Sequence, residues 1–173
     1  MSRPEVVLRL VQTEDEVSAA ASLAGEFAEW ARGRIFAEYG IDLELEDEQG
    51  LLSDLEGLRV SRARLYLAEI AGAPVGVGGL KPLGADDAEI KRMYVRPSAR
   101  GLGAGAAILR RLIDDAHTLG YRRIHLDTGR FMLEAQSLYR RFGFVPSSPQ
   151  TGWEFESVPA MHETAVFMSL DLG

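Results

Sequence analysis

The 173-residue chain contains no cysteine, and this absence excludes several kinds of chemistry at once. Without thiols the chain can form neither disulfides nor thiolate metal sites, and it cannot carry an acyl group on cysteine. Its three histidines, His117, His125 and His162, are separated and show no recognisable metal-ligand spacing. We therefore expect a protein without a metal, and the missing cysteines favour a cytoplasmic location.

Long apolar runs and an excess of basic charge are also missing. No stretch approaches the length that spans a membrane, and the first ten residues lack the apolar core of a signal peptide. The formal net charge is −7, whereas nucleic-acid binders are usually basic overall. We therefore expect no membrane and no nucleic-acid partner, while a homodimer stays open. The length predicts one domain, residues 1–173, with a sizeable core.

Charge is distributed unevenly along the chain. Residues 1–60 hold 14 acids against 5 bases, whereas residues 91–141 hold 11 bases against 4 acids. The basic part would suit a ligand that carries several phosphates. Eight acids and no base stand between Glu38 and Glu56. This acidic run is either a solvated surface or a rim that favours a cationic acceptor, and the sequence leaves both interpretations open.

The most informative stretch, residues 88–106, joins a strand to a helix through a glycine-rich turn. A half-apolar strand at residues 89–95 ends at a proline turn, and the sequence RGLGAG from Arg100 to Gly105 then runs into a helix. Glycines at the start of a helix let the backbone approach a ligand and leave N–H groups pointing outward. Those donors and the positive end of the helix dipole attract phosphate. The stretch therefore predicts an anion-binding site.

Two other interpretations compete with this one. The pattern G-x-G-x-x-A that starts at Gly101 also satisfies the dinucleotide-binding fingerprint, and Asp127 follows at a suitable distance. However, the preceding strand carries Glu89, Lys91 and Arg92, which is unlike a parallel strand buried on both faces. The remaining interpretation is a glycine-rich turn with a purely structural role.

Two segments together resemble a known family. The pattern R-x-x-G-x-G behind the strand EIKRMYV resembles the central motif of the GNAT superfamily of N-acetyltransferases. The sequence LDTGRFMLEAQSLYRRFGF at residues 126–144 resembles the next strand and helix of that family. The matching segments run from about Leu65 to Phe144, close to half of the chain. The resemblance implies an enzyme that moves the acetyl group of acetyl-CoA directly to a primary amine of a small molecule or peptide.

Hydrophobic periodicity predicts the order of the elements. Strands are expected at residues 6–11, 64–71, 74–82, 89–95, 123–128 and 164–172. Helices are expected at residues 13–40, between the glycine turn and residue 119, and at 133–142, and a short one is expected to begin at about residue 47. The fold class is α/β (α+β): a GNAT-like mixed, mostly antiparallel sheet of about seven strands with helices on both faces. Met93, Tyr94 and Val95 are apolar in succession, which interrupts the alternation of the strand and predicts a β-bulge.

The resemblance also assigns roles to individual residues. The glycine turn and the backbone of the bulged strand would hold the acyl donor, and Gln136 would replace a pantetheine contact of an asparagine that this chain lacks. Tyr139 matches the family's tyrosine near the thioester sulfur and would protonate the departing thiolate, unless it is only a core residue. The expected cofactor-binding residues are Met93, Tyr94, Val95, Arg100, Gly101, Leu102, Gly103, Ala104, Gly105, Ala106 and Gln136.

Glu89 is the first candidate for the general base, Asp127 is the second, and proton removal by solvent alone is the remaining possibility. Glu89 occupies a position where some family members place a glutamate that acts through water, and Asp127 matches the position that other members use. Either carboxylate could instead be an ion partner of a nearby basic residue. A non-catalytic acyl-CoA-binding or sensor module on the same fold is the alternative to an enzyme.

Overall fold

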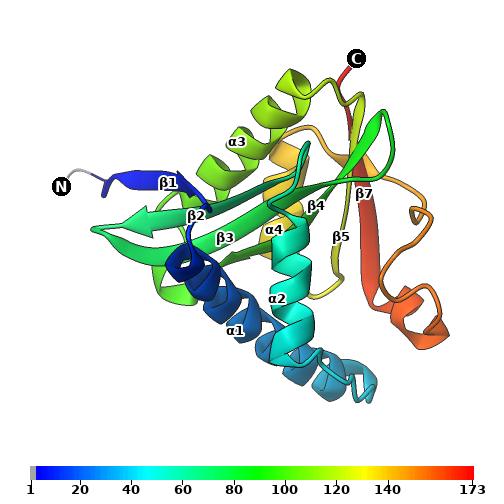
Figure 1. The fold of residues 1–173 in the computed structure, drawn as a ribbon. Helices are drawn as coiled ribbons and strands as arrows, with labels where there is room; N and C mark the ends of the chain where they lie inside the picture. The colour runs from blue at the N-terminus through cyan, green and yellow to red at the C-terminus, as the bar shows by residue number, and fades with distance from the viewer. Residues whose placement is uncertain (1–2) are drawn as a thin grey trace.

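The computed structural model describes residues 3–173 and contains a seven-stranded mixed sheet with the strand order β1-β2-β3-β4-β5-β7-β6 (Figure 1). The strands are β1 (Val6–Leu10), β2 (Arg64–Ile70), β3 (Ala73–Pro82), β4 (Asp87–Val95), β5 (Arg123–Gly129), β6 (Val145–Pro146) and β7 (Ala165–Asp171). Within residues 3–173 only β4 and β5 pair in parallel. The predicted sheet is confirmed, and a doubly wound parallel fold for dinucleotides is excluded.

Four α-helices cover the two faces of the sheet (Figure 1). The helices are α1 (Glu14–Tyr39), α2 (Glu48–Gly57), α3 (Ala104–Thr118) and α4 (Leu133–Arg141). The first two pack with one apolar cluster, and the last two pack with another on the opposite face. None of the helices within residues 3–173 is long and apolar enough to cross a membrane.

The first helix begins and ends as its sequence predicts. Thr13 and Glu16 form the capping box, and Gly40 closes the helix with a left-handed φ of 69°. Its buried residues begin with Val17, Ala20 and Leu23, which share one face of the helix. The next apolar residues, Phe27, Ala28 and Ala31, are only partly buried because they line a cavity. The apolar residues in the N-terminal half of α1 therefore pack in the core, and those in the C-terminal half line the cavity.

The helix behind the glycine turn, α3, begins at Ala104. Leu102 precedes the helix, and Gly103 is its N-cap with a φ of 97°. The buried face includes Ile108, Leu109 and Leu112. Asp115, on the same helix, faces β2, where its carboxylate accepts a hydrogen bond from the hydroxyl of Tyr66.

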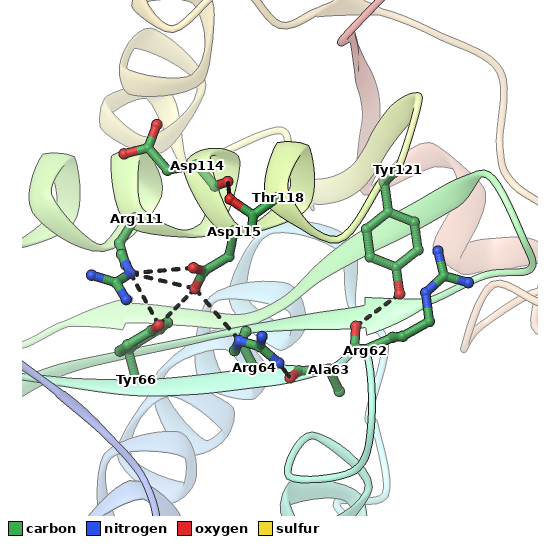
Figure 2. A network of polar contacts seen from close by, with 9 residues as sticks. All are labelled: Arg62, Ala63, Arg64, Tyr66, Arg111, Asp114, Asp115, Thr118 and Tyr121. Atoms are coloured by element: carbon green, nitrogen blue, oxygen red, sulfur yellow. Dashed lines mark hydrogen bonds and ion pairs between the residues drawn. The ribbon is translucent and has the colours of Figure 1, made fainter.

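Figure 2 shows the polar network that joins α3 to β2. The Tyr66 hydroxyl donates to Asp115 Oδ2 at 2.6 Å, and Arg111 Nε donates to the Tyr66 oxygen at 3.1 Å. Arg64 Nε lies 3.8 Å from the same carboxylate. At the far end of the helix, the Tyr121 hydroxyl donates to the carbonyl oxygen of Arg62 at 2.7 Å. These contacts fix the position of α3 over the sheet.

The predicted bulge in β4 is confirmed. Tyr94 pairs with Val77 and Lys91 pairs with Gly79, so two residues of β4 lie opposite Gly78 alone. Arg92, inside the bulge, has a φ of 56°, a conformation that L residues rarely adopt. Pairing between β4 and β5 ends at Glu89 and His125, and the two strands then separate.

Candidate active site

A cavity of about 460 Å³ lies where β4 and β5 separate. Its walls come from α1, residues 43–51, the ends of β4 and β5, residues 131–139 and residues 153–165. Most of the side chains that line it are apolar, and the aromatic ones are Phe27, Phe131, Tyr139, Trp153 and Phe155. The cavity is therefore a mainly apolar space with access to both separated strands.

Tyr139 lies on α4 and presents its side chain to this cavity. The side chain is 4% exposed, and its hydroxyl makes no hydrogen bond to any group of residues 3–173. Burial, and to a smaller extent the charge of Asp127, raises the pKa of the Tyr139 hydroxyl well above its usual range. The hydroxyl therefore stays protonated at neutral pH and can donate into the cavity.

Two carboxylates lie beside each other at this cavity, one in its wall and the other behind it. Asp127 lines the cavity, whereas Glu89 is 5% exposed and accepts a hydrogen bond from Gln150 Nε2 at 2.8 Å. Burial raises the pKa of both carboxyls, and the charge of Asp127 raises that of Glu89 further. The neighbouring Lys91 opposes this shift in both, while its own Nζ lies 3.1 Å from Glu154 Oε2. The sequence-predicted candidates for the base are thus adjacent, but only Asp127 reaches the cavity.

Residues 146–163 contribute three polar side chains that sequence reasoning missed: Gln150, Trp153 and Glu154. Trp153 is 4% exposed and packs edge-on against Phe167, with ring centroids 4.9 Å apart. Its indole lies near Asp127 and lowers the pKa of that carboxyl, yet Nε1 has no partner in hydrogen-bonding geometry among residues 3–173. In the sequence, the only indication that this segment contributes to the site is a single tryptophan in a stretch without periodicity.

The glycine turn lies outside the cavity, at the end of β4. Gly101 and Gly103 both have positive φ, and a Cβ at Gly101 would meet no atom within 4 Å. The backbone N–H groups of the turn and of the first helical turn find no partner among residues 3–173; they belong to Gly101, Gly103, Ala104, Gly105 and Ala106. The N-terminus of α3 therefore presents a group of free backbone N–H donors, which is what an anion-binding site requires.

Two arginines flank this turn. Arg100 Nε donates to the carbonyl oxygen of Val95 at 3.3 Å, and its guanidinium lies 5.8 Å from the ring of Trp30. Arg3 Nη2 donates to the carbonyl oxygen of Gly101 at 2.6 Å. Both side chains are exposed, and they add positive charge beside the free N–H groups. The first of them is a sequence-predicted residue, and the second was missed because it comes from the far N-terminal end.

The residues of the bulge point to different sides. Met93 lines the cavity and also packs with the core beneath α3 and α4. The ring of Tyr94 faces α1, with its centroid 5.7 Å from that of Phe27. Val95 lies between the core and the glycine turn, because its side chain is close to the position where Gly105 would carry a Cβ.

Gln136 has a different environment from the one expected. Its Nε2 donates to the carbonyl oxygens of Gly129 at 2.9 Å and Arg130 at 3.1 Å, and its Oε1 accepts from Arg140. The side chain is 5% exposed. Its polar atoms are therefore used to fix the turn after β5, which argues against the expected contact to a pantetheine amide.

Most of the acidic run between Glu38 and Glu56 is paired with arginine. Arg92 contacts Asp54 at 2.7 Å and Glu46 at 3.2 Å, while Arg32 contacts Asp42 at 3.0 Å. Glu38 and Glu56 pair with Arg34 and Arg59. These four arginines offset half of the eight negative charges of the run, and all four lie outside it in the sequence. No group of three or more metal-ligating side chains within residues 3–173 could hold a metal ion.

Comparison with known proteins places these features in a family. The family model described as "Acetyltransferase (GNAT) family" matches residues 27–144. An uncharacterized N-acetyltransferase of Schizosaccharomyces pombe is 38% identical over 115 residues, which cover 65% of this chain and 71% of that protein. An IAA acetyltransferase of Azospirillum brasilense is 34% identical over 103 residues, which cover 59% and 67%.

Solved structures agree with the sequence relatives. An acetyltransferase from Streptococcus agalactiae superposes with a TM-score of 0.74 over 96% of this chain and 98% of its own, at 14% identity. The structure of yncA from Salmonella typhimurium, solved with its cofactor acetyl-CoA, gives a TM-score of 0.67 over 97% and 94%, at 19% identity. Because the family model covers more than half of the chain and the fold matches throughout, the chain belongs to the GNAT family of acetyltransferases.

Proposed function

We propose that this protein transfers the acetyl group of acetyl-CoA directly to a primary amine. The observation that carries the proposal is a pair of features along β4 and just beyond it. The N–H groups at the start of α3 have no partner within residues 3–173, and the split between β4 and β5 opens into a cavity. A phosphate-bearing carrier held at the first feature can extend its acyl end into the second. The family relationship and the acetyl-CoA of the structural neighbour support the same donor.

The glycine turn fits the pyrophosphate of this co-substrate. Positive φ at Gly101 and Gly103 turns successive N–H groups outward, and no Cβ stands in front of them. Arg100 and Arg3 would add charge-assisted contacts to phosphate oxygens from the two sides of the turn. The bulge frees the backbone of Arg92 and Met93 from regular pairing, so that N–H groups there can bind the pantetheine arm and the thioester oxygen.

Tyr139 would supply the proton for the sulfur. The thioester provides an activated acetyl group, and its departing thiolate is a base with an ordinary pKa of about 8.5. The protonated Tyr139 hydroxyl faces the cavity without a protein partner, so it is free to donate there. Because burial holds its pKa high, the proton returns readily to the tyrosinate after each turnover.

Asp127 is the carboxylate best placed to remove the proton from the amine, because it lines the cavity. Glu89 lies behind it, enclosed and hydrogen-bonded to Gln150, and would act through the electrostatic coupling of the two carboxyls. A raised pKa makes each of them a stronger base once ionised. This assignment places Asp127 before Glu89, although the sequence alone favoured the reverse order.

The experiment that tests the function measures the release of free CoA thiol from acetyl-CoA by the purified full chain, with a panel of primary amines. Acetylated product detected by mass spectrometry, together with loss of turnover in Tyr139→Phe, is the expected result. Calorimetric binding of acetyl-CoA without product from any amine would favour a non-catalytic acyl-CoA-binding module instead. Binding of NAD but not of acetyl-CoA would contradict the proposal altogether.

A further inference from the structure

The cavity gives more information about the acceptor than the sequence did. Its volume of about 460 Å³ falls within the roughly 300–1,000 Å³ typical of small-molecule sites. The wall away from Tyr139 is built from Phe27, Phe131, Phe155 and the aliphatic side chains of Ile35 and Leu43. Apolar surface of this kind gains free energy only when an apolar group covers it.

The cations that line the cavity are all occupied. Lys91 contacts Glu154 at 3.1 Å, Arg92 contacts Asp54 and Glu46, and Arg32 contacts Asp42 at 3.0 Å. Within residues 3–173, no other lysine or arginine lines this space. A carboxylate that entered with the acceptor would therefore have to compete with an existing carboxylate partner for each of these cations, or stay unpaired in an apolar cavity.

The carboxylates that line the cavity are of two kinds: Glu46 and Glu154 are the partners of the cations above, whereas Glu29, Glu44 and Asp127 form no ion pair within residues 3–173. Asp127 lines the cavity without an ion pair among residues 3–173, and Glu89 stands behind it. Glu44, at the outer part of the cavity, also has no basic partner there. An amine thus meets carboxylates that are free to accept its protons, whereas an anionic group meets only cations that are already neutralised.

We propose that the acceptor is a small primary amine carried on an aromatic-sized apolar body, with no carboxylate next to the amine. This inference rests on the proposed function, since it defines the acceptor of that same reaction. The amine nitrogen lies towards Asp127 and Tyr139, and the apolar body lies against Phe131 and Phe27. Amino acids are poor acceptors because their carboxylate finds no free cation.

The reaction balances with groups already described. The amine nitrogen forms a bond to the acetyl carbon while the bond from that carbon to sulfur breaks. One proton leaves the nitrogen for the carboxylate of Asp127, and the sulfur takes one from Tyr139. Transfer of a proton from Asp127 back to the tyrosinate, directly or through solvent, restores both groups. No oxidant, reductant or metal is required.

The test compares three acceptors that differ in one group each. Phenethylamine has an amine and an apolar ring, phenylalanine adds a carboxylate beside the amine, and ethylamine lacks the ring. We expect kcat/KM for phenethylamine to exceed that for each of the others by at least about tenfold. Loss of one buried hydrophobic contact, or burial of one unpaired charge, lowers kcat/KM by roughly this factor. Equal or better turnover with phenylalanine or with ethylamine would overturn the inference while the proposed function stands. Turnover with none of the three and none of a wider amine panel would overturn both.

A pair of variants locates the selectivity in the cavity. Phe131 is partly buried in the wall, whereas Phe36 on α1 is 59% exposed and does not line the cavity. Phe131→Ala is expected to raise KM for phenethylamine at least about fivefold and to leave ethylamine unchanged. Phe36→Ala should leave both unchanged. A parallel loss for the two amines in Phe131→Ala, or an equal loss in Phe36→Ala, would contradict the placement of the apolar body.

Discussion

At the phosphate end of the site, most of the groups proposed to contact a ligand are backbone N–H groups of one continuous turn, with the side chains of Arg100 and Arg3 beside them. At the acceptor end the proposed contacts are side chains from five separate segments. A phosphate site built from backbone N–H groups requires glycines at fixed positions of the sequence. An acceptor site built from side chains requires only that distant segments meet in the fold, and it requires no fixed residue pattern in any of those segments. Backbone chemistry therefore leaves a readable motif in the sequence, and side-chain chemistry assembled by the fold does not.

Tyr139→Phe should give the largest effect on kcat, because the proposed thioester lies at Tyr139, between the phosphate end and the acceptor end of the site. The change keeps the ring next to Phe144 and removes only the hydroxyl. We expect kcat to fall by about 10²–10⁴-fold, the usual range for a lost general acid, with the Kd of acetyl-CoA within a few-fold of wild type. Steady-state kinetics and calorimetry measure the two quantities. Unchanged kcat would leave Tyr139 as a core residue.

Gly103→Glu tests the backbone end alone, and Gly120→Glu is its matched control. Both glycines have positive φ, 97° and 80°, so both variants carry a similar strain of about 1–2 kcal/mol. Only Gly103 belongs to the free N–H surface, whereas Gly120 closes the opposite end of α3. We expect at least about tenfold weaker acetyl-CoA binding in Gly103→Glu, and near wild-type binding in Gly120→Glu, by calorimetry. Equal weakening in the two would assign the effect to strain and move the phosphate site elsewhere.

The pH dependence of kcat/KM distinguishes the roles of Asp127 and Glu89. Because burial raises the pKa of Asp127, the acidic limb of kcat/KM should lie above the ordinary carboxyl range. Asp127→Asn is expected to lower kcat/KM about tenfold or more at pH 6–7 and to recover much of it by pH 9, where neutral amine is more abundant. Glu89→Gln should lower kcat/KM less than Asp127→Asn does, because Glu89 is enclosed behind Asp127 and does not line the cavity. The reversed order would return the main role to Glu89.

A smaller effect is expected on stability. The raised pKa of Glu89 means that the folded state holds its proton more tightly than the unfolded state does. Wild type should therefore lose stability as pH rises from the ordinary carboxyl range through the raised pKa, while Glu89→Gln should not. We expect the variant to melt on the order of 2–4 °C higher than wild type at pH 8 and equally at pH 4, by calorimetry. A lower melting temperature at pH 8 would show that the attraction to Lys91 outweighs burial.

The fold was largely predictable because its signals are local. The capping box at Thr13, the glycine stop at Gly40 and the irregular alternation at Met93 each depend on residues a few positions apart. The exceptions depend on partners far away in sequence. Asp115 turns towards the sheet because Tyr66 is there, and no helical pattern contains that information.

The candidate site was predictable only in part, for the same reason. The glycine turn, Tyr139 and the two carboxylates were found from motifs, and their roles remain proposals. Gln136 was expected to bind the cofactor, but its amide is used by the backbone of Gly129 and Arg130. The contributions of Trp153 and Arg3 could not be predicted, because each reaches the site from a segment without a motif.

The polar network that joins α3 to β2 (Figure 2) has a kinetic consequence. Asp115 and Arg111 tie the middle of the helix to Tyr66, so the N–H groups at its start are held in place before any ligand arrives. A site that needs no rearrangement can capture its ligand at a rate set by diffusion and orientation. Association of the acyl donor should therefore follow a single exponential that rises linearly with its concentration, without a slower conformational phase.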